Sequence, residues 1–357
     1  MAKTSRLLDR ALPVFDGPQA WVGAEMAKRR DWICELNREE LAEIDGAVAA
    51  CVERRTSLVA MTAADFPLPR LAPRLAELRA KVLHGAGFCL LRGVPVERYD
   101  ALEAALLFRG IGAHWGEALS QNGKGHVLGH VADLGVDLKD AGARGYQSKA
   151  ELRFHVDGGD IVALLCLRPA KSGGLSRIAS STTVWNQIVH RRPDLAAELL
   201  APFHLSRWGE VGAGQQRSAK VRLFSPCAGR LMVVYIMSAI EKAQAFDEVP
   251  RLSAAQAEAL ALVNTLAGDD AIRLDMDFRP GDMQFLCNHS ILHARTDYED
   301  FPEPQRRRHL LRQWFACADG PALPADVLHG FQGATAIGRP AGIRVPGVSL
   351  SAPLQPE

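Results

Sequence analysis

The sequence has no excess of charge of one sign and no long apolar run, and each absence argues against a class of protein. The 357 residues carry 42 Lys and Arg against 41 Asp and Glu, a formal net charge of +1. Such a balance gives no electrostatic field that would attract nucleic acid or an anionic membrane surface. No apolar run approaches the roughly 20 residues that a transmembrane helix needs. We therefore expect no nucleic-acid partner and no membrane insertion.

Paired cysteine motifs and a secretory leader are also absent. The seven cysteines are an odd number, widely spread, and contain no CxxC pair. This argues against a disulfide framework and a zinc site, and it favours small buried thiols in a reducing compartment. Residues 1–21 have no apolar core of the kind that a secretory leader requires. The default expectation is a cytoplasmic protein.

The chain is expected to be helical in its first part and rich in strands later. Capping signatures at Asn37 and Asp100 predict helix starts, and a further helix is expected over 73–84. From about residue 150, short apolar runs alternate with turn residues, which is typical of a β-sandwich or barrel. One helix, from Ser253 to about Gly268, interrupts this part. The predicted strand runs are 87–96, 160–167, 174–180, 230–236, 271–278, 282–288 and 309–316.

These patterns predict one catalytic domain of the α+β or mainly β class. A helical region, 1–86, is expected to pack on a β-rich core, 87–330, and a Pro-rich tail, 331–357, follows.

Two pairs of residues carry the first chemical signals. His155 and Asp157 end an apolar–polar alternation, so on a strand their side chains would point to the same face. This HxD pattern is frequent by chance when it stands alone. Later in the chain His289 and His293 are four residues apart, but no Glu follows the first histidine as the zinc-protease signature requires.

A cluster of arginines at 306–312 is the third signal. A solvated strand edge would explain Arg306 and Arg307. It does not explain Arg312, which has apolar residues on both sides. Arg308 and Arg312 are an even number of residues apart, so a strand would present both on one face.

An HxD pair, a distal histidine and a following arginine, in this order, resemble the Fe(II)/2-oxoglutarate-dependent dioxygenases of the taurine dioxygenase-like (TauD/TfdA) family. The resemblance extends from about Gly87 to Ala316. It includes the segments GFCLLRGVPV, LRFHVD, KSGGLSRIASS, PGDMQFLCNHSILHART and RRRHLLRQW. It implies a double-stranded β-helix, or jelly roll, with flanking helices.

The resemblance implies that His155, Asp157 and His293 are ligands of a ferrous ion and that the triad acts in catalysis. Two imidazoles and one carboxylate on one face leave positions open for substrate and O2. His289 is then interpreted as a structural residue rather than a ligand.

The resemblance also implies a site for 2-oxoglutarate. Its far carboxylate would bind Arg308, because a planar and permanently charged guanidinium can bind a carboxylate with two hydrogen bonds. Ser176, after the Gly173-Gly174 turn, would add a hydroxyl. Arg312 is a second cation, directed toward the co-substrate or an anionic group of the substrate. The register between the two arginines stays open.

Candidate substrate contacts come from segments that border the site in the resemblance. Tyr146 and Gln147 lie just before the metal strand, and Gln121 and Asn122 precede a glycine-rich loop. The segment Arg207-Trp208 fits either a lid or a surface loop.

The predicted activity is oxidation of an unactivated C–H bond of a small anionic or amino-acid-like molecule, with release of succinate and CO2. The outcome can be hydroxylation, desaturation or cyclisation. Two alternatives remain: a zinc-type hydrolase that uses the same triad, and a non-catalytic binding module. The partners expected are a small-molecule substrate and, as the commonest soluble assembly, a second copy in a homodimer.

Overall fold

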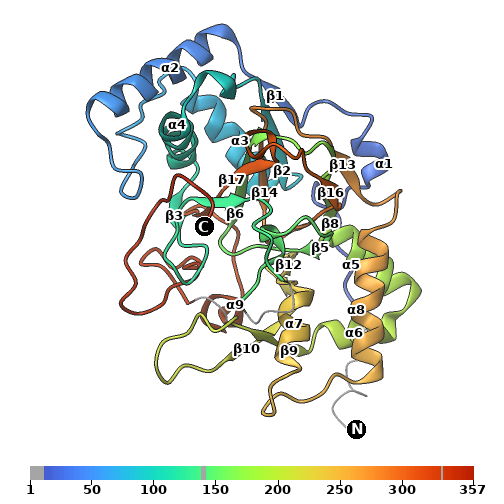
Figure 1. Cartoon of the computed structure of the whole chain (residues 1–357). Helices are drawn as coiled ribbons and strands as arrows, with labels where there is room; N and C mark the ends of the chain where they lie inside the picture. Colours follow the sequence, from blue (N-terminus) through green and yellow to red (C-terminus); the bar gives the residue numbers. More distant parts are fainter. Residues whose placement is uncertain (1–11, 138–141, 331–332) are drawn as a thin grey trace.

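The computed structural model describes residues 12–137, 142–330 and 333–357, with two β-sheets at its centre (Figure 1). In this part of the chain the larger sheet has seven strands and is antiparallel except for the parallel pair β1 and β2. Its order is β1 (Ile33–Glu35), β2 (Phe88–Arg92), β14 (Met283–Cys287), β6 (Ile161–Arg168), β17 (His309–Ala316) and β3 (Glu117–Leu119), with β4 (Gly129–Val131) also on β17.

The smaller sheet has four antiparallel strands in the order β13 (Leu274–Met276), β8 (Ser176–Ser180), β15 (Ile291–Arg295) and β5 (Leu152–His155). It brings β15, late in the chain, beside β5. Three short pairs lie outside both sheets: β7 (Ser172–Gly173) with β16 (Tyr298–Glu299), β9 (Pro202–Ser206) with β10 (Ser218–Arg222), and β11 (Phe224–Cys227) with β12 (Arg230–Val233).

Alternating side chains of the larger sheet belong to two different apolar layers. On β6, Ile161, Ala163 and Leu165 face the helices, whereas Val162 and Cys166 belong to the layer that also contains residues of the smaller sheet. This is the period of two expected for strands buried on both faces. The result is a mixed α/β fold with strand-rich sheets and an apolar layer between them.

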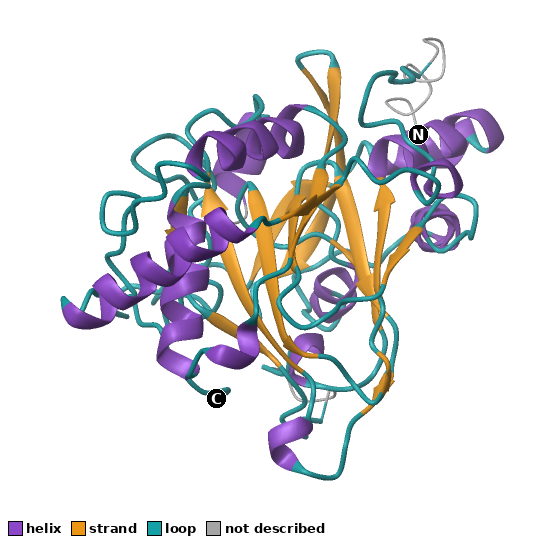
Figure 2. Cartoon of the chain, turned by 90° about the horizontal axis from the view of Figure 1, so that it is seen from above, coloured by secondary structure: helices purple, strands orange, loops and turns teal. Residues whose placement is uncertain are grey.

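Helices cover the outer faces of both sheets (Figure 2). On the larger sheet lie α2 (Arg38–Glu53), α3 (Ala72–His84) and α4 (Ala101–Ala113). On the smaller sheet lie α5 (Ser181–Arg191), α6 (Pro193–Leu199), α7 (Met237–Ala243) and α8 (Ala254–Ala267). The remaining short elements are α1 (Gly23–Met26), η1 (Val96–Arg98), η2 (Gly145–Gln147), η3 (Pro304–Arg306) and α9 (Ala325–Gly330). In the described part of the chain, no helix combines the length and the apolarity needed to cross a bilayer.

The helix starts predicted at Asn37, Asp100 and Ser253 are confirmed, and each has a complete capping box. The prediction that a single helix interrupts the strand-rich part is wrong, because α5, α6 and α7 also lie there. The start of α5 escapes detection because Ser180, which ends β8, is also its N-cap and accepts a hydrogen bond from the Thr183 amide. A run of Ser and Thr at that point resembles a turn.

The C-terminal residues lie along the edge of the larger sheet. Ser351 forms backbone hydrogen bonds with Gly125 and Val127, both at 2.9 Å. His130 Nε2 donates to the Pro353 carbonyl at 2.9 Å, so its Nδ1 must accept, and it lies 2.7 Å from His309 Nε2. These contacts hold the end of the chain in place.

The two rings must both be neutral for this arrangement to form. His309 Nε2 donates to His130, so His309 Nδ1 is left to accept from Arg168 Nη2 at 3.2 Å. Burial, together with the nearby His130 and Arg168, lowers the pKa of His309 to about 3, and burial also lowers the pKa of His130.

We expect stability to fall in mild acid because of this pair. The unfolded chain protonates His309 near pH 6.5, but the folded chain does so only near pH 3. The neutral His309 therefore contributes fully to the free energy of unfolding above about pH 6.5, and this contribution is lost as the pH falls toward 3. At about 1.4 kcal/mol per pH unit, this group alone lowers the free energy of unfolding by about 2 kcal/mol between pH 6.5 and 5.

Urea unfolding of His309→Gln at pH 7, 6 and 5 measures this slope. The variant should lose less stability than the wild type over the interval. His190→Gln, on the exposed face of α5, is the matched control and should keep the wild-type slope. Identical slopes for all three proteins would show that the buried pair does not control acid stability.

Candidate metal centre and active site

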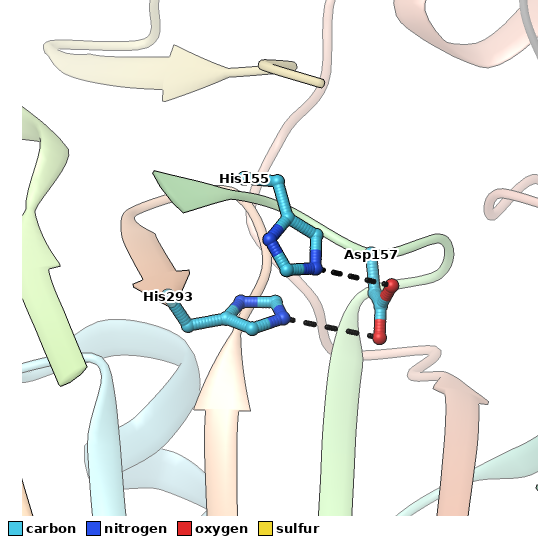
Figure 3. Close-up of side chains that lie close together, drawn as sticks. All are labelled: His155, Asp157 and His293. Carbon is cyan, nitrogen blue, oxygen red and sulfur yellow. Dashed lines mark ion pairs between the residues drawn. The ribbon is translucent and has the colours of Figure 1, made fainter. Parts of the chain in front are cut away.

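Pairing of β15 with β5 brings the two histidines of the candidate metal centre together. His155 is the last residue of β5, and it lies directly opposite His293 of β15 in the antiparallel register. Opposed residues on adjacent strands point to the same face, and the ring centroids are 4.2 Å apart. Asp157 follows β5 by two residues and turns its carboxylate toward both rings (Figure 3).

The three side chains form a compact donor set. One donor atom from each lies within 4.8 Å of the others. Nε2 of His155 is 3.9 Å from Asp157 Oδ1, and Nε2 of His293 is 3.9 Å from Asp157 Oδ2 (Figure 3). Two imidazoles and one carboxylate suit a first-row divalent ion such as Fe(II).

Both imidazoles have the protonation that a metal ligand needs. His155 Nδ1 lies 2.8 Å from the Arg153 carbonyl and donates to it, so the Nε2 lone pair faces the carboxylate. Burial, and next the neighbouring His155, lowers the pKa of His293 to about 3, so this ring is neutral at pH 7. Its Nδ1 is buried and has no hydrogen-bond partner.

Two donors from β17 orient the Asp157 carboxylate. Arg312 Nη1 and Trp314 Nε1 both donate to Oδ2 at 3.0 Å. Burial by itself raises the pKa of Asp157, but Arg312 and then the two histidines outweigh it, and the pKa is lowered. The carboxylate is therefore ionised at neutral pH and held in one orientation.

Gln121 in turn fixes Arg312. Its Oε1 accepts from Arg312 Nε at 2.8 Å, and its Nε2 donates to the Arg312 carbonyl at 2.8 Å. Gln121 is only 1% exposed and does not line either cavity described below. Its contacts in the structure make it a positioning residue for Arg312.

The other candidate substrate contacts differ in whether they line the two cavities beside the triad. Tyr146 lines both cavities, and its ring lies 4.5 Å from the Arg312 guanidinium carbon. Gln147 accepts from the Arg144 amide at 3.1 Å and Asn122 accepts from the Lys124 amide at 3.0 Å. Neither of these two residues lines the cavities.

An inner cavity of about 50 Å³ extends from the triad between the two sheets. Arg308, Ser176 and Arg312, the candidate residues for 2-oxoglutarate, line it. Arg308 is only 4% exposed, and its Nη1 has no partner. Gly174 has φ +71° and a Cβ there would lie 3.0 Å from Arg308 Nε, so glycine permits this close approach.

Arg295 is a cavity residue that the sequence patterns did not single out. It lines the inner cavity from the end of β15, and its Nη1 also lacks a partner. Burial, and next the charge of Arg308, lowers the pKa of Arg295 to about 10. The alternation of β15 carries the signal, because Arg295 is two residues beyond His293 and therefore shares its face.

An outer cavity of about 280 Å³ also borders the triad, at His155 and Asp157. Arg207 and Trp208 line it, so this segment forms part of the cavity wall. Arg144 forms a largely buried ion pair with Glu210, and its guanidinium carbon lies 4.1 Å from the Trp208 ring centroid. The sequence patterns singled out neither Arg144 nor Glu210, because a pair 66 residues apart leaves no local signal.

His289 lies outside the triad, consistent with its interpretation as a structural residue. Its Nε2 is 2.8 Å from Asp160 Oδ1, and both side chains are buried. The neighbouring Asn288 accepts from the Asp157 amide at 3.2 Å. Asn288 and His289, in the turn between β14 and β15, therefore hold the loop that carries Asp157.

Comparison with known proteins identifies relatives over most of the chain. The model of the family described as "Taurine catabolism dioxygenase TauD, TfdA family" matches residues 53–314. A taurine hydroxylase-like protein, SAT17, of Stachybotrys chartarum is 30% identical over 304 residues, which are 82% of this chain and 77% of that protein. The FR-33289 synthase of Streptomyces rubellomurinus is 29% identical over 318 residues, 87% of this chain and 93% of that protein.

Solved structures agree with the fold. An asparagine oxygenase in complex with Fe(II), hydroxyasparagine and succinate superposes with a TM-score of 0.63. It is 16% identical, and the match covers 80% of this chain and 93% of the other.

We expect the triad to bind one divalent ion, and His293 and His289 provide a matched test. His293→Ala should weaken Co(II) binding by more than about 100-fold, because losing a ligand costs more than losing a residue that only supports one. His289→Asn should weaken binding less, by no more than about 10- to 100-fold, because His289 only supports the loop that carries Asp157. Calorimetric titration of the metal-free proteins with Co(II) measures both. Wild-type affinity in His293→Ala would rule out the triad as the site.

Proposed function

The chain belongs to the TauD/TfdA family, and we propose that it oxidises an unactivated C–H bond of a small anionic or amino-acid-like molecule. It is an Fe(II)- and 2-oxoglutarate-dependent dioxygenase, so its co-substrates are 2-oxoglutarate and O2. The co-products are succinate and CO2. The assignments of individual residues that follow are part of the proposal.

The observation that carries the proposal is the His155, Asp157 and His293 donor set beside a buried arginine without a full set of partners. We assign these three residues as the iron ligands. When bound, the ferrous ion together with 2-oxoglutarate activates O2 for oxidation of the substrate C–H bond. The protein keeps the two histidines neutral and Asp157 ionised. Arg312 and Trp314 orient the Asp157 carboxylate.

We assign Arg308 to the far carboxylate of 2-oxoglutarate. A buried guanidinium with an unpaired N–H is costly, and a carboxylate in the inner cavity would pair with it. Ser176 lines the same cavity and can donate its hydroxyl hydrogen, which now bonds Gln284 at 3.3 Å. Arg312 already donates to Asp157 and Gln121, so it is less available, and this supports Arg308 in the register.

The outer cavity supports an anionic substrate. Arg144, Arg207, Arg312 and Arg344 line it, against the carboxylates of Asp157 and Glu210. Four guanidinium groups against two carboxylates give the wall a net positive charge. We propose Tyr146 and Arg312 as substrate contacts. Gln147, Gln121 and Asn122 do not line the cavity, and their role as substrate contacts stays a prediction.

The proposal also covers the jelly-roll topology and the cellular compartment. The two facing sheets with an apolar layer between them are consistent with a double-stranded β-helix, or jelly roll. Cytoplasmic residence is supported by the seven cysteines, which are all free in the described residues. The division into 1–86, 87–330 and 331–357 and the homodimer stay predictions. Residues 1–11, on which the leader interpretation partly rests, lie outside the described part of the chain.

The two alternative functions explain less of the site. A zinc-type hydrolase does not require an anionic co-substrate, so it leaves the inner cavity with Arg308 and Arg295 unexplained. A binding module would not need a neutral His293 beside an ionised Asp157. Family membership favours the dioxygenase over both.

Anaerobic titration with Fe(II) and 2-oxoglutarate tests the proposal. We expect a weak visible charge-transfer band at a ratio of one per chain, because the co-substrate chelates the ion. Asp157→Ala should lose the band and succinate formation, since the ion loses its anionic ligand. Full succinate formation by this variant would contradict the assignment.

The two arginines can be distinguished by the affinity for 2-oxoglutarate. Hydrogen bonds between charged groups contribute about 1.5–3 kcal/mol, so Arg308→Gln should raise the 2-oxoglutarate constant by about 10- to 100-fold. Arg312→Gln should weaken the binding of an anionic substrate more than the binding of 2-oxoglutarate. Both constants are measured at saturating Fe(II). If Arg312→Gln affects 2-oxoglutarate more than Arg308→Gln does, the register is reversed.

A further inference from the structure

A buried ion pair connects the C-terminal part of the chain to the loop that carries Asp157. Arg339 Nε donates to Asp160 Oδ2 at 2.9 Å, and its Nη2 donates to Oδ1. Its Nη1 donates to the Pro321 carbonyl at 2.8 Å. Asp160 is fully buried and Arg339 is 7% exposed, so this pair is shielded from water.

Asp160 is also bound to the metal loop and to the strands beside it. His289 and the Cys317 amide both contact its carboxylate at 2.8 Å. Its backbone carbonyl accepts from the Asn288 amide at 2.9 Å, and Asn288 in turn holds the Asp157 amide. Burial by itself raises the pKa of Asp160, but bonds from His289 and Arg339 outweigh it, so the pKa is lowered.

The segment 333–344, which contains Arg339, returns to the wall of the outer cavity. Thr335 N donates to the Arg339 carbonyl at 2.7 Å, and Ile343 N donates to the Ser120 carbonyl at 2.9 Å. Gly342 has φ +69°, and a Cβ there would lie 2.5 Å from that same Ser120 oxygen. A side chain at 342 would push the segment off the wall.

Residues of this segment face the proposed substrate position. Ile343 and Arg344 line the outer cavity together with His155 and Asp157. Arg344 is half exposed, and its nearest carboxylate, Glu117, is 4.0 Å away, too far for a strong hydrogen bond. The wall therefore offers one apolar side chain and one accessible cation.

We propose that segment 333–344 is a substrate-selectivity element of the active site, with Arg339 as its positioning residue. Ile343 and Arg344 contact the part of the substrate that lies away from the metal, and Arg344 binds an anionic group there. This inference rests on the proposed function. It adds that the C-terminal segment determines which anionic molecules are accepted.

Three variants distinguish the clamp, which is the Arg339–Asp160 ion pair, from the substrate contacts proposed for Ile343 and Arg344. Arg339→Met removes the ion pair and should free the segment. Arg344→Gln and Ile343→Ala change the wall but leave the Asp160 bonds intact, so they remain informative if Arg339→Met folds poorly. Arg222→Gln is the control, because Arg222 forms an exposed ion pair with Asp326 in the same half of the chain.

Hydrogen–deuterium exchange of the metal-free proteins tests the clamp without any reaction. Arg339→Met should exchange the Ile343 amide at least about tenfold faster than the wild type, since its bond to Ser120 opens more often. Arg222→Gln should exchange at the wild-type rate. Unchanged exchange in Arg339→Met would overturn the positioning role. This result is independent of whether the chain is a dioxygenase.

Binding of anionic probes tests the selectivity role. Taurine, L-aspartate and phosphonoacetate are titrated anaerobically into the Fe(II)–2-oxoglutarate complex, and the shift of its visible band reports binding. Arg344→Gln should weaken the binding of the tightest-binding probe by about tenfold and leave formation of the initial band unchanged. Arg222→Gln should change neither the probe affinity nor the band. Wild-type probe affinity in Arg344→Gln, or no probe binding to the wild type, would overturn the anion-binding wall. Absence of the initial band in the wild type would contradict the proposed function instead.

Discussion

The register between β5 and β15 is the constraint on which the candidate active site depends. It places His293 directly opposite His155, although 138 positions separate the two residues, and thereby fixes two of three donors on one face of the smaller sheet. A shift by one residue would turn His293 to the opposite face. β15 also pairs with β8 along its other edge, so backbone hydrogen bonds on both edges fix the position of β15.

The larger sheet completes the site through electrostatics. Arg312 and Trp314 project from β17 into the space between the sheets and donate to Asp157, and Gln121 holds Arg312 from behind. The smaller sheet and the loop after β5 thus supply the three donors, and β17 of the larger sheet supplies the two groups that orient Asp157. Arg308, directly before β17, lines the inner cavity together with Leu310 and Arg312, so one segment borders the triad and the proposed pocket for 2-oxoglutarate.

Local signals in the sequence were sufficient for the parts of the molecule that depend on neighbours in the chain. Capping residues marked three helices and apolar runs marked the central strands, whereas the donor set followed from the resemblance of the HxD pair and the distal histidine to the TauD/TfdA family. Long-range partners left no such signal. Gln121 resembled a loop contact because its partner, Arg312, is 191 residues away, and Arg339 gave no pattern because its role requires Asp160, 179 residues away. The proposed cavity wall at 333–344 was missed for the same reason.

The central claim is that the three donors and Arg308 form one site for an ion and its co-substrate. Anomalous X-ray diffraction from crystals grown anaerobically with Fe(II) and 2-oxoglutarate tests it most directly. The account predicts a single strong iron peak bounded by His155, Asp157 and His293, with the far carboxylate of 2-oxoglutarate on Arg308. An iron peak elsewhere, such as beside His289, or a co-substrate carboxylate on another residue would contradict it.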